Sequence, residues 1–575
     1  MNAPMKSTEA GAGTLAEAYL RLLADRGVDC LFANAGTDFA PLIEAYARAG
    51  EGSATPRPIT VPHENVAVCM ALGHWLISRR MQAVMVHVNV GTANTICGLL
   101  NAARANIPIL MTAGRTPLTE TGMEGQRNLH IHWTQEMYDQ AAMLREVVKW
   151  DYELRNVAQM EITVDRAISV AQASPPGPVY LTLPREVLAT RLTEPFEALP
   201  AGRRIAPAPP GPDAAAVEHA AALFAAAKRP VIITTSMGLE KDGVATLAAF
   251  AEKHAIPVVQ HVPRCMSLPS SHPMHGGYDP APWMKEADLV VAIESVVPWI
   301  PGTQRPLPDA KVTHIGTDPL FQDIPTRGFE CDLGITSTGA AALQAIDAAL
   351  AKLGGRDDKA IAARRADVVK RREARVAMAA KALEEARAAT PIRTPWLTHC
   401  ISEACDANTV VIREAPAFSF PHFKAEREHA YYSAGAASGL GWGLGAAIGA
   451  KIAAPEKTII CVSGDGSYMF GVPVAAHYTA LEQDAPFLTI IVNNQRWNEV
   501  GVATRQLYPD GVAVREKKEA LTYFDKRLDL HKVVESVGGH GERVTDPAKL
   551  PEALKRALRI VLEERRQVVL DVVCA

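Results

Sequence analysis

Three features are scarce in this sequence: paired cysteines, long apolar runs and an excess of charge of one sign. The nine cysteines are scattered singly, and the closest two, Cys400 and Cys405, lack the CxxC spacing of redox and zinc sites. Buried reduced thiols are therefore expected. No uncharged apolar run approaches the roughly 18 to 20 residues that span a bilayer. The net charge of -4 gives no indication of a nucleic-acid or membrane partner.

The beginning of the chain, MNAPMKSTEAGAG, is polar and small. It lacks the charged segment and the following apolar core that mark a secretory signal. We therefore expect a cytoplasmic protein.

The length indicates several domains, because 575 residues exceed the usual size of one hydrophobic core. Two compositional breaks divide the chain, a Pro-rich stretch at 197–216 and an Ala-, Arg- and Glu-rich stretch at 353–391. The second break predicts a solvated helical connector. We expect an N-terminal domain at 1–195, a central domain at 210–352 and a C-terminal domain at 392–575.

Short β-branched runs alternate with Ala-rich helical patterns in all three domains. QAVMVHV (82–88), RPVIITTS (229–236) and KTIICVSG (457–464) are largely apolar, as in strands that are buried on both faces. The predicted fold class is α/β, with three domains that each hold a mainly parallel sheet flanked by helices. Ligands of such sheets bind beyond the carboxyl ends of the strands.

The first and last domains resemble each other. Residues 85–114 and 460–494 each contain a strand, a glycine turn, an Ala-rich helix and a short strand preceded by proline. We therefore expect two sister domains around a divergent central Rossmann-like domain. Such a pair can form a site at its interface, within one chain or across a dimer.

The strongest motif follows the run KTIICVSG. Asp465 stands between two glycines at the end of this predicted strand, and Asn493-Asn494 closes the next strand along the chain. Their side-chain oxygens suit Mg²⁺, which takes few ligands from protein carboxylates and the rest from phosphates, carbonyls and water. The glycines and the helix that follows favour a diphosphate.

This GDG…NN pattern resembles the signature of thiamine diphosphate (ThDP)-dependent enzymes. The resemblance extends over nearly the whole chain and is strongest to the branch with acetolactate synthase, benzoylformate decarboxylase and pyruvate oxidase. It implies that Asp465, the Asn494 side chain and the Arg496 carbonyl ligate Mg²⁺. It also implies diphosphate contacts from three neighbouring residues, which are Gly464, Gly466 and Ser467.

A ThDP enzyme also needs a carboxylic acid that bonds the aminopyrimidine ring. Glu64 follows an apolar strand and opens an Ala-rich helix, which is the family's position for this glutamate. A favourable charge at a helix start is the structural alternative. A zinc site of the HExxH type is disfavoured, because Ala67 stands where the second histidine is needed.

A glycine-rich stretch at 433–453 is the third element. It fits a loose GxGxxA dinucleotide pattern, but no apolar strand precedes it and no acidic residue follows at the right distance. The resemblance implies that Leu440 props the cofactor into a bent shape and that the Ser438 carbonyl accepts a hydrogen bond from its 4′-amino group. Packing of small residues between helices accounts for most of the glycines.

Substrate-side residues carry weaker signals. Thr37 aligns with a hydroxyl that touches the substrate carboxylate in benzoylformate decarboxylase, and His87 aligns with a proton-handling histidine of that enzyme. Gln135 belongs to a QE pair that resembles one in acetolactate synthases. At 415–417 the chain lacks the paired hydroxyls that hold the diphosphate in benzoylformate decarboxylase, which leaves that contact to backbone or to Ser419.

The resemblance implies a ThDP- and Mg²⁺-dependent decarboxylase or carboligase that acts on a 2-oxo acid, with a proton, an aldehyde or an oxo acid as acceptor. Two alternatives stay open, a flavin-containing oxidase of the pyruvate oxidase type and a non-catalytic ThDP-binding paralogue. The central domain holds FAD, ADP or nothing. A homodimer or homotetramer is expected, because in this family Glu64 of one subunit serves the cofactor held by its neighbour.

Overall fold

The computed structural model describes residues 13–50, 52–355, 357–414 and 418–575. The described residues form two compact units. The first unit comprises 13–207, 435–455 and 469–486, and the second comprises 208–434, 456–468 and 487–575. The prediction about the missing hydroxyls at 415–417 concerns residues outside the described part of the chain.

The first unit holds a six-stranded parallel sheet in the order β2-β1-β3-β4-β6-β5. Its strands are β1 (Cys30–Asn34), β2 (Arg57–Thr60), β3 (Ala83–Val86), β4 (Leu110–Arg115), β5 (Asp151–Glu153) and β6 (Val179–Pro184). Its helices are α1 (Leu15–Asp25), η1 (Thr37–Phe39), α2 (Ala40–Ala49), α3 (Glu64–Ser78), α4 (Val88–Asn94), α5 (Ile96–Arg104), α6 (Ile131–Thr134), η2 (Ala141–Met143), η3 (Val157–Gln159), α7 (Met160–Gln172), α8 (Arg185–Ala189), η4 (Ala201–Arg203), α15 (Trp442–Ala453) and α17 (Pro473–Glu482).

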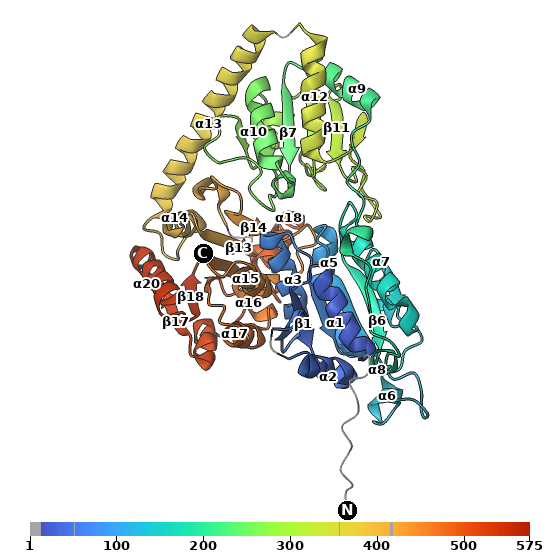
Figure 1. The fold of residues 1–575 in the computed structure, drawn as a ribbon. Coiled ribbons are helices and arrows are strands. Elements are labelled where there is room, and N and C mark those ends of the chain that lie inside the picture. The colour runs from blue at the N-terminus through green and yellow to red at the C-terminus, as the bar shows by residue number, and fades with distance from the viewer. Residues whose placement is uncertain (1–12, 51, 356, 415–417) are drawn as a thin grey trace, which may run out of the picture. The chain divides into compact units, whose positions relative to one another are not determined.

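The second unit begins with a central six-stranded parallel sheet in the order β12-β11-β10-β7-β8-β9. Its strands are β7 (Pro230–Thr234), β8 (Val258–Gln260), β9 (His275–Gly277), β10 (Leu289–Ile293), β11 (Lys311–Gly316) and β12 (Leu333–Thr336). The helices of this part are α9 (Ala214–Ala226), η5 (Met237–Leu239), α10 (Gly243–His254), α11 (Ala281–Met284) and α12 (Gly339–Leu353). The single long helix α13 (Asp358–Ala386) follows (Figure 1).

The third sheet is also parallel and has the order β14-β13-β15-β16-β18-β17. Its strands are β13 (Thr409–Arg413), β14 (Tyr431–Ser433), β15 (Thr458–Gly464), β16 (Leu488–Asn493), β17 (His540–Val544) and β18 (Val568–Val573). The remaining helices are α14 (Thr394–Ala404), η6 (Phe420–His422), α16 (Asp465–Phe470), α18 (Asn498–Leu507), α19 (Val512–Arg515), η7 (Leu530–Val537), η8 (Pro547–Lys549) and α20 (Leu550–Glu563).

The predicted fold class is confirmed, since each sheet is parallel and flanked by helices. Numbered within its own sheet, the first sheet has the strand order 2-1-3-4-6-5, and the third sheet repeats it, whereas the central sheet has the order 6-5-4-1-2-3. The first and third sheets are therefore topological sisters around a different central fold. β3 and β15 are equivalent strands, as are β4 and β16.

Each sheet builds its own apolar core from strands that are buried on both faces. β4, β6, β10 and β16 are buried almost throughout, which explains why their sequences are apolar rather than alternating. The nine cysteines are free thiols. Six are buried and two are half-buried, but Cys331 is exposed, so the expectation of burial is wrong for that residue. In the described part of the chain, no helix combines the length and apolarity needed to cross a bilayer.

Candidate active site

The GDG…NN motif lies at the carboxyl edge of the third sheet. β15 and β16 are adjacent and parallel, with Gly464 opposite Val492. Asp465 begins α16 directly after β15, and Asn494 follows the last residue of β16. The register of two neighbouring strands therefore places Asp465 and Asn494 at the same edge of the sheet, and joint binding of a metal by their side chains stays a prediction.

The Asp465 carboxylate is buried, with 4% of the residue exposed. It accepts hydrogen bonds from the backbone N–H groups of Gly466 and Gln495, both at 2.7 Å. Among the described residues it has no cationic partner, and burial raises its pKa above the ordinary range. A buried carboxylate that lacks a counter-charge fits a bound cation.

The chain after β16 turns back towards Asp465. Gln495 has a positive φ of 55°, which aims its N–H at the carboxylate, and the Asn494 Oδ1 accepts the N–H of Arg496 at 3.2 Å. The turn that carries the Asn494 carboxamide is thus hydrogen-bonded to the Asp465 carboxylate. This donor set suits Mg²⁺ when the remaining ligands come from other oxygens.

Gly466 has a structural reason in addition to the expected contact with a diphosphate. A Cβ at this position would lie 2.2 Å from the Trp497 ring, so the glycine is needed for the packing of that indole. A Cβ on Gly464 would meet only the Ser467 Oγ, at an ordinary 3.6 Å, and Ser467 itself is buried. The diphosphate contacts implied for these residues stay predictions.

Glu64 is the first residue of α3, and the His63 imidazole caps the helix by accepting the Asn65 N–H at 3.2 Å. The Asn94 side chain at the end of α4 donates to the Glu64 Oε2 at 3.0 Å. Gly91 of α4 is close enough that an added Cβ would stand 3.4 Å from the other carboxylate oxygen. α4 therefore fixes the orientation of the Glu64 carboxylate.

Ser438 and Leu440 belong to a tight turn that leads into α15. Ser438 has a positive φ of 49°, a conformation that glycine adopts without strain. Asn101 of α5 holds the turn, since its Nδ2 donates to the Gly439 carbonyl at 2.8 Å and its Oδ1 accepts the Gly439 N–H at 2.9 Å. The turn and Glu64 belong to the same unit.

Thr37 and His87 follow β1 and β3, which are adjacent parallel strands. Between them lies Asp38, which sequence reasoning missed. The Asp38 carboxylate is 2% exposed, and its Oδ1 lies 2.6 Å from the His87 Nδ1. Because the carboxylate can only accept, the His87 Nδ1 carries the hydrogen, and Nε2 is the nitrogen free to exchange a proton.

Two glycines make room for the Asp38–His87 pair. A Cβ on Gly36 would stand 2.1 Å from the His87 ring, and a Cβ on Gly114 would stand 1.8 Å from the Asp38 carboxylate. Val88, the residue after His87, has a positive φ of 28°, which is rare for a β-branched residue. Strain of this kind is common at functional sites.

His132 is a second histidine at this edge of the sheet and was also missed. Its Nδ1 accepts the backbone N–H groups of Asn128 and Leu129 at 3.2 and 3.4 Å, so Nε2 carries the hydrogen and faces the Thr37 hydroxyl at 3.5 Å. Burial, with the charges of Arg185 and Arg127, lowers the pKa of His132. Its neutral imidazole can donate to the Thr37 hydroxyl only through this long contact.

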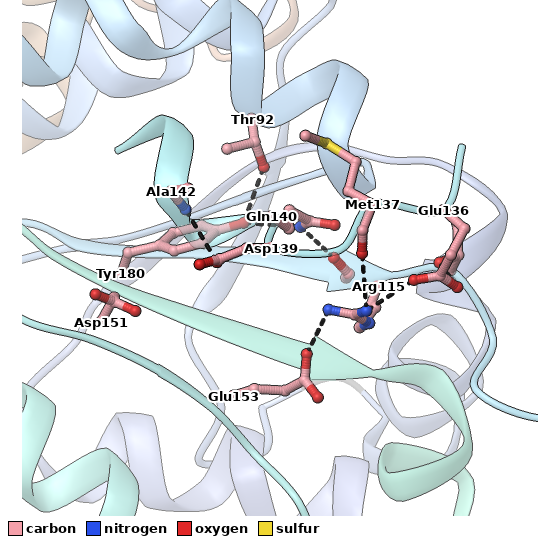
Figure 2. A network of polar contacts seen from close by, with 12 residues as sticks. Thr92, Arg115, Glu136, Met137, Asp139, Gln140, Ala142, Asp151, Glu153 and Tyr180 are labelled. Carbon is pink, nitrogen blue, oxygen red and sulfur yellow. Dashed lines mark hydrogen bonds and ion pairs between the residues drawn. The ribbon is translucent and has the colours of Figure 1, made fainter. Parts of the chain in front are cut away.

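The two residues of the QE pair have different hydrogen-bond surroundings. Glu136 is the centre of an ion-pair network, where it accepts from Arg115 at 2.7 Å, from the Thr116 hydroxyl at 2.8 Å and from Arg127 at 2.5 Å. Figure 2 shows Arg115 held between Glu136 and Glu153. The buried Oε1 of Gln135, by contrast, has no hydrogen-bond partner among the described residues.

The same picture shows the network that anchors α4. The Tyr180 hydroxyl, fully buried on β6, lies 3.0 Å from the Thr92 hydroxyl and accepts from the Gln140 Nε2 at 2.8 Å (Figure 2). Thr92 in turn donates to the Val88 carbonyl at 2.6 Å. These bonds fix the helix that begins after His87 and ends at Asn94, which contacts Glu64.

Ser419, which is predicted to substitute for the missing hydroxyls, is hydrogen-bonded to two neighbouring residues. Its Oγ lies 2.6 Å from the Nδ1 of His422, and its N–H donates to the Thr398 hydroxyl at 3.0 Å.

Three sequence models of one family match most of the chain. They are described as thiamine pyrophosphate enzyme, N-terminal TPP binding domain (residues 13–143), central domain (217–346) and C-terminal TPP binding domain (415–572).

Similar proteins span nearly the whole chain. A sulfoacetaldehyde acetyltransferase of Rhodobacter capsulatus is 27% identical, covering 95% of this chain and 92% of the relative. The acetolactate synthase large subunit of Haemophilus influenzae is 23% identical, with the same coverage of 95% and 92%. The thiamine diphosphate-dependent 4-hydroxybenzoylformate decarboxylase of Rhodococcus jostii shares the fold, with a TM-score of 0.76, 20% identity and coverage of 98% and 99%.

Proposed function

Because the chain belongs to the thiamine pyrophosphate enzyme family, in the branch of acetolactate synthase and benzoylformate decarboxylase, we propose that it is a Mg²⁺-dependent enzyme that decarboxylates a small 2-oxo acid. The observation that carries this proposal is the buried Asp465 carboxylate, which lacks a cationic partner among the described residues and lies beside the turn of Asn494. That arrangement is suited to a metal ion that anchors a diphosphate.

In this proposal Asp465, the Asn494 side chain and the Arg496 carbonyl hold Mg²⁺. Gly464, Gly466 and Ser467 contact the diphosphate. When bound, ThDP supplies an electron sink for the carbanion that forms as a 2-oxo acid loses CO₂. The protein supplies orientation, proton positions and exclusion of water.

Glu64 holds a proton at the aminopyrimidine ring of the cofactor. The bond from Asn94 keeps the carboxyl group at one orientation, and the anchored helix α4 keeps Asn94 in place. The Ser438 carbonyl accepts from the cofactor's amino group. Leu440 supports the bent cofactor from the neighbouring turn.

His87 moves a proton between its Nε2 and the reacting carbon or oxygen. Asp38 fixes the ring and stabilises the imidazolium that forms when Nε2 is protonated. Thr37 contacts the substrate carboxylate through its hydroxyl, which lies 3.5 Å from the His132 Nε2. Gln135, whose Oε1 has no partner among the described residues, faces substrate or acceptor.

The acceptor is the finer part of the proposal. The named relatives include an acetyltransferase that is named for sulfoacetaldehyde and acetolactate synthases. We therefore include carboligation, in which an aldehyde or oxo acid takes the place of the proton. The decarboxylation half-reaction is common to both outcomes.

Two carboxylates argue against the flavin alternative. Glu240 accepts the N–H groups of Gly339 and Ala340 at 2.8 and 2.9 Å, so it already occupies the N-terminus of α12. Glu294, directly after β10, accepts the Thr317 N–H at 2.9 Å. Glu240 thus takes the backbone donors that a dinucleotide diphosphate would use at this helix, and Glu294 adds a second carboxyl group at the strand ends.

A panel of 2-oxo acids tests the proposal. Purified protein with ThDP and Mg²⁺ is incubated with pyruvate, benzoylformate and longer 2-oxo acids, with and without aldehyde acceptors, and CO₂ and products are measured by mass spectrometry. We expect CO₂ from at least one acid, lost on Glu64→Gln but not on Glu44→Gln, an exposed control. No CO₂ from any acid would contradict the proposal, and strong absorbance near 450 nm from bound flavin would contradict the argument against a flavin in the central domain.

A further inference from the structure

A cavity lies in the second unit, and none of the residues assigned above to the cofactor or the substrate is among its described lining residues. It has a volume of about 840 Å³, within the range of small-molecule sites. Its walls are α13, the segment from β9 to α11, and η6. It lies beside the edge strand β9. Ser236, Glu294 and Thr317, at the carboxyl ends of β7, β10 and β11, are not among its described lining residues.

The cavity offers flat apolar surfaces. The rings of Tyr278 and Phe420 are stacked at 5.1 Å between centroids, and Trp283 adds a third aromatic side chain to the lining. Ala379 and Ala382 of α13 leave space opposite them. Such a surface suits a planar or aliphatic ligand body.

Three arginines of α13 also line the cavity, and they differ in their partners. Arg371 is neutralised by Glu286 and by Asp367, the latter at 2.9 Å. Arg372 and Arg375 have no carboxylate partner among the described residues. Their recorded hydrogen bonds are to backbone carbonyls, those of Ser270 and His275.

Neither of these two cations is balanced by a carboxylate of the described residues, although Arg375 also lies over the Trp283 ring, 5.7 Å from its centre. The Arg372 Nε is buried without a hydrogen-bond partner, and burial together with the charges of Arg372 and Arg371 lowers the pKa of Arg375 to about 10. Asp279 also lines the cavity, but it is exposed and accepts from the Gln304 side chain at 3.0 Å. A guanidinium pair in an apolar cavity is stabilised by an anion.

We propose that this cavity binds a small amphipathic organic anion, whose phosphate, carboxylate or sulfonate pairs with Arg372 and Arg375 and whose apolar body packs on Tyr278 and Phe420. The two arginines favour an anionic ligand, and a cavity of this volume holds a small molecule and not a second copy of the chain. This site is independent of the proposed decarboxylation.

Two fluorescent probes of similar shape test the proposal on the holoenzyme. 8-Anilinonaphthalene-1-sulfonate is an aromatic anion, and N-phenyl-1-naphthylamine is its neutral counterpart. We expect the sulfonate to bind one saturable site per chain and to lose at least about tenfold in affinity on Arg372→Gln or Arg375→Gln, since charge-assisted bonds are the stronger ones. The neutral probe should be unaffected by these substitutions.

Lys370→Gln is the matched control, because Lys370 is an exposed cation on the same helix outside the cavity. It should leave binding of the sulfonate unchanged. Ala374→Trp fills the cavity with both arginines intact and should abolish binding. Phenyl phosphate and phenylacetate are then used as competitors. The one that displaces the dye at the lower concentration identifies the preferred head group, phosphate or carboxylate.

Equal affinity of the sulfonate for wild type and the arginine variants would overturn the proposal, as would the absence of a saturable site. A change in molecular mass on Arg375→Gln without a change in dye affinity would also overturn it, because the cavity would then be a contact between copies.

Discussion

At the scale of single residues, the Asp38–His87 pair is the clearest case of one side chain acting through another. The 2.6 Å hydrogen bond sets the tautomer of His87. The glycines at 36 and 114 leave room for the two side chains, because a Cβ at either position would overlap one of them. We predict that Asp38→Asn lowers the turnover number by about 100-fold, the lower end of the range for lost acid–base catalysis. ThDP affinity should stay within about twofold, because the bond does not touch the diphosphate site.

A double-mutant cycle separates positioning from a role of Asp38 in folding. If Asp38 acts through His87, Asp38→Asn adds almost nothing to His87→Gln. Turnover of the four proteins and their thermal midpoints supply the cycle. Fully additive losses would show that the two residues act independently.

Glu294 predicts a pH dependence of stability. Burial, with the nearby charge of Glu240, raises its pKa from 4.5 to about 7. Between these two values the folded protein holds a proton that the unfolded chain releases, so stability falls as the pH rises through this window. Glu294→Gln has no charge to bury, and its Oε1 can still accept the Thr317 N–H.

We therefore expect Glu294→Gln to raise the thermal midpoint at pH 8 by on the order of 2 °C or more and to match wild type at pH 4. Glu218→Gln, an exposed change on α9, should shift nothing at either pH. Scanning calorimetry across this range measures both. A gain that is largest at pH 4 would refute the assignment.

At the scale of elements, helices α3 and α15 pack through glycines. A Cβ on Gly73 would lie 2.0 Å from the Ala446 carbonyl oxygen, and a Cβ on Gly449 would lie 1.9 Å from the Met70 carbonyl oxygen. Backbone cannot yield as a side-chain tip does. The close approach therefore accounts for the small residues at 443–450, the structural reading given to most of them from sequence.

Gly449→Ala should accordingly destabilise the protein by about 2 to 3 kcal/mol, the upper part of the usual cost of overpacking. Gly202→Ala is the matched control, because an added Cβ there meets nothing within 4 Å. Urea unfolding followed by circular dichroism compares the two. Equal midpoints for both variants and wild type would show that α3 and α15 accommodate the added methyl group without loss of stability.

The sequence predicts elements better than it predicts contacts between them. Apolar runs mark strands such as β15 and β16, and strand ends mark Asp465 and Asn494, because both are local patterns. Sequence reasoning missed Asp38 because its partner His87 is 49 positions away in the chain. No local pattern signals a buried hydrogen bond between residues so far apart in sequence. The hydrogen bond from Asn94 to Glu64 could not be predicted from the sequence either, since it depends on how α4 packs against α3.

At the scale of the whole molecule, the proposal assigns cofactor roles to residues of both units, Glu64 of the first and Asp465 of the second. The resemblance implies that these two residues act on one cofactor from different subunits, so we predict that the holoenzyme is at least a dimer. Light scattering should give a mass of at least twice the 61.8 kDa of one chain. A fully active species with the mass of one chain would contradict this prediction.

The central claim is that Asp465 and Asn494 bind ThDP through Mg²⁺. Calorimetric titration of ThDP into wild type, Asp465→Asn and Glu44→Gln, each with Mg²⁺ and with chelator, tests it directly. The account predicts tight binding that requires Mg²⁺ in wild type and Glu44→Gln, and at least about tenfold weaker binding, or 1.4 kcal/mol, in Asp465→Asn. Undiminished binding by Asp465→Asn, or by wild type in chelator, would contradict it.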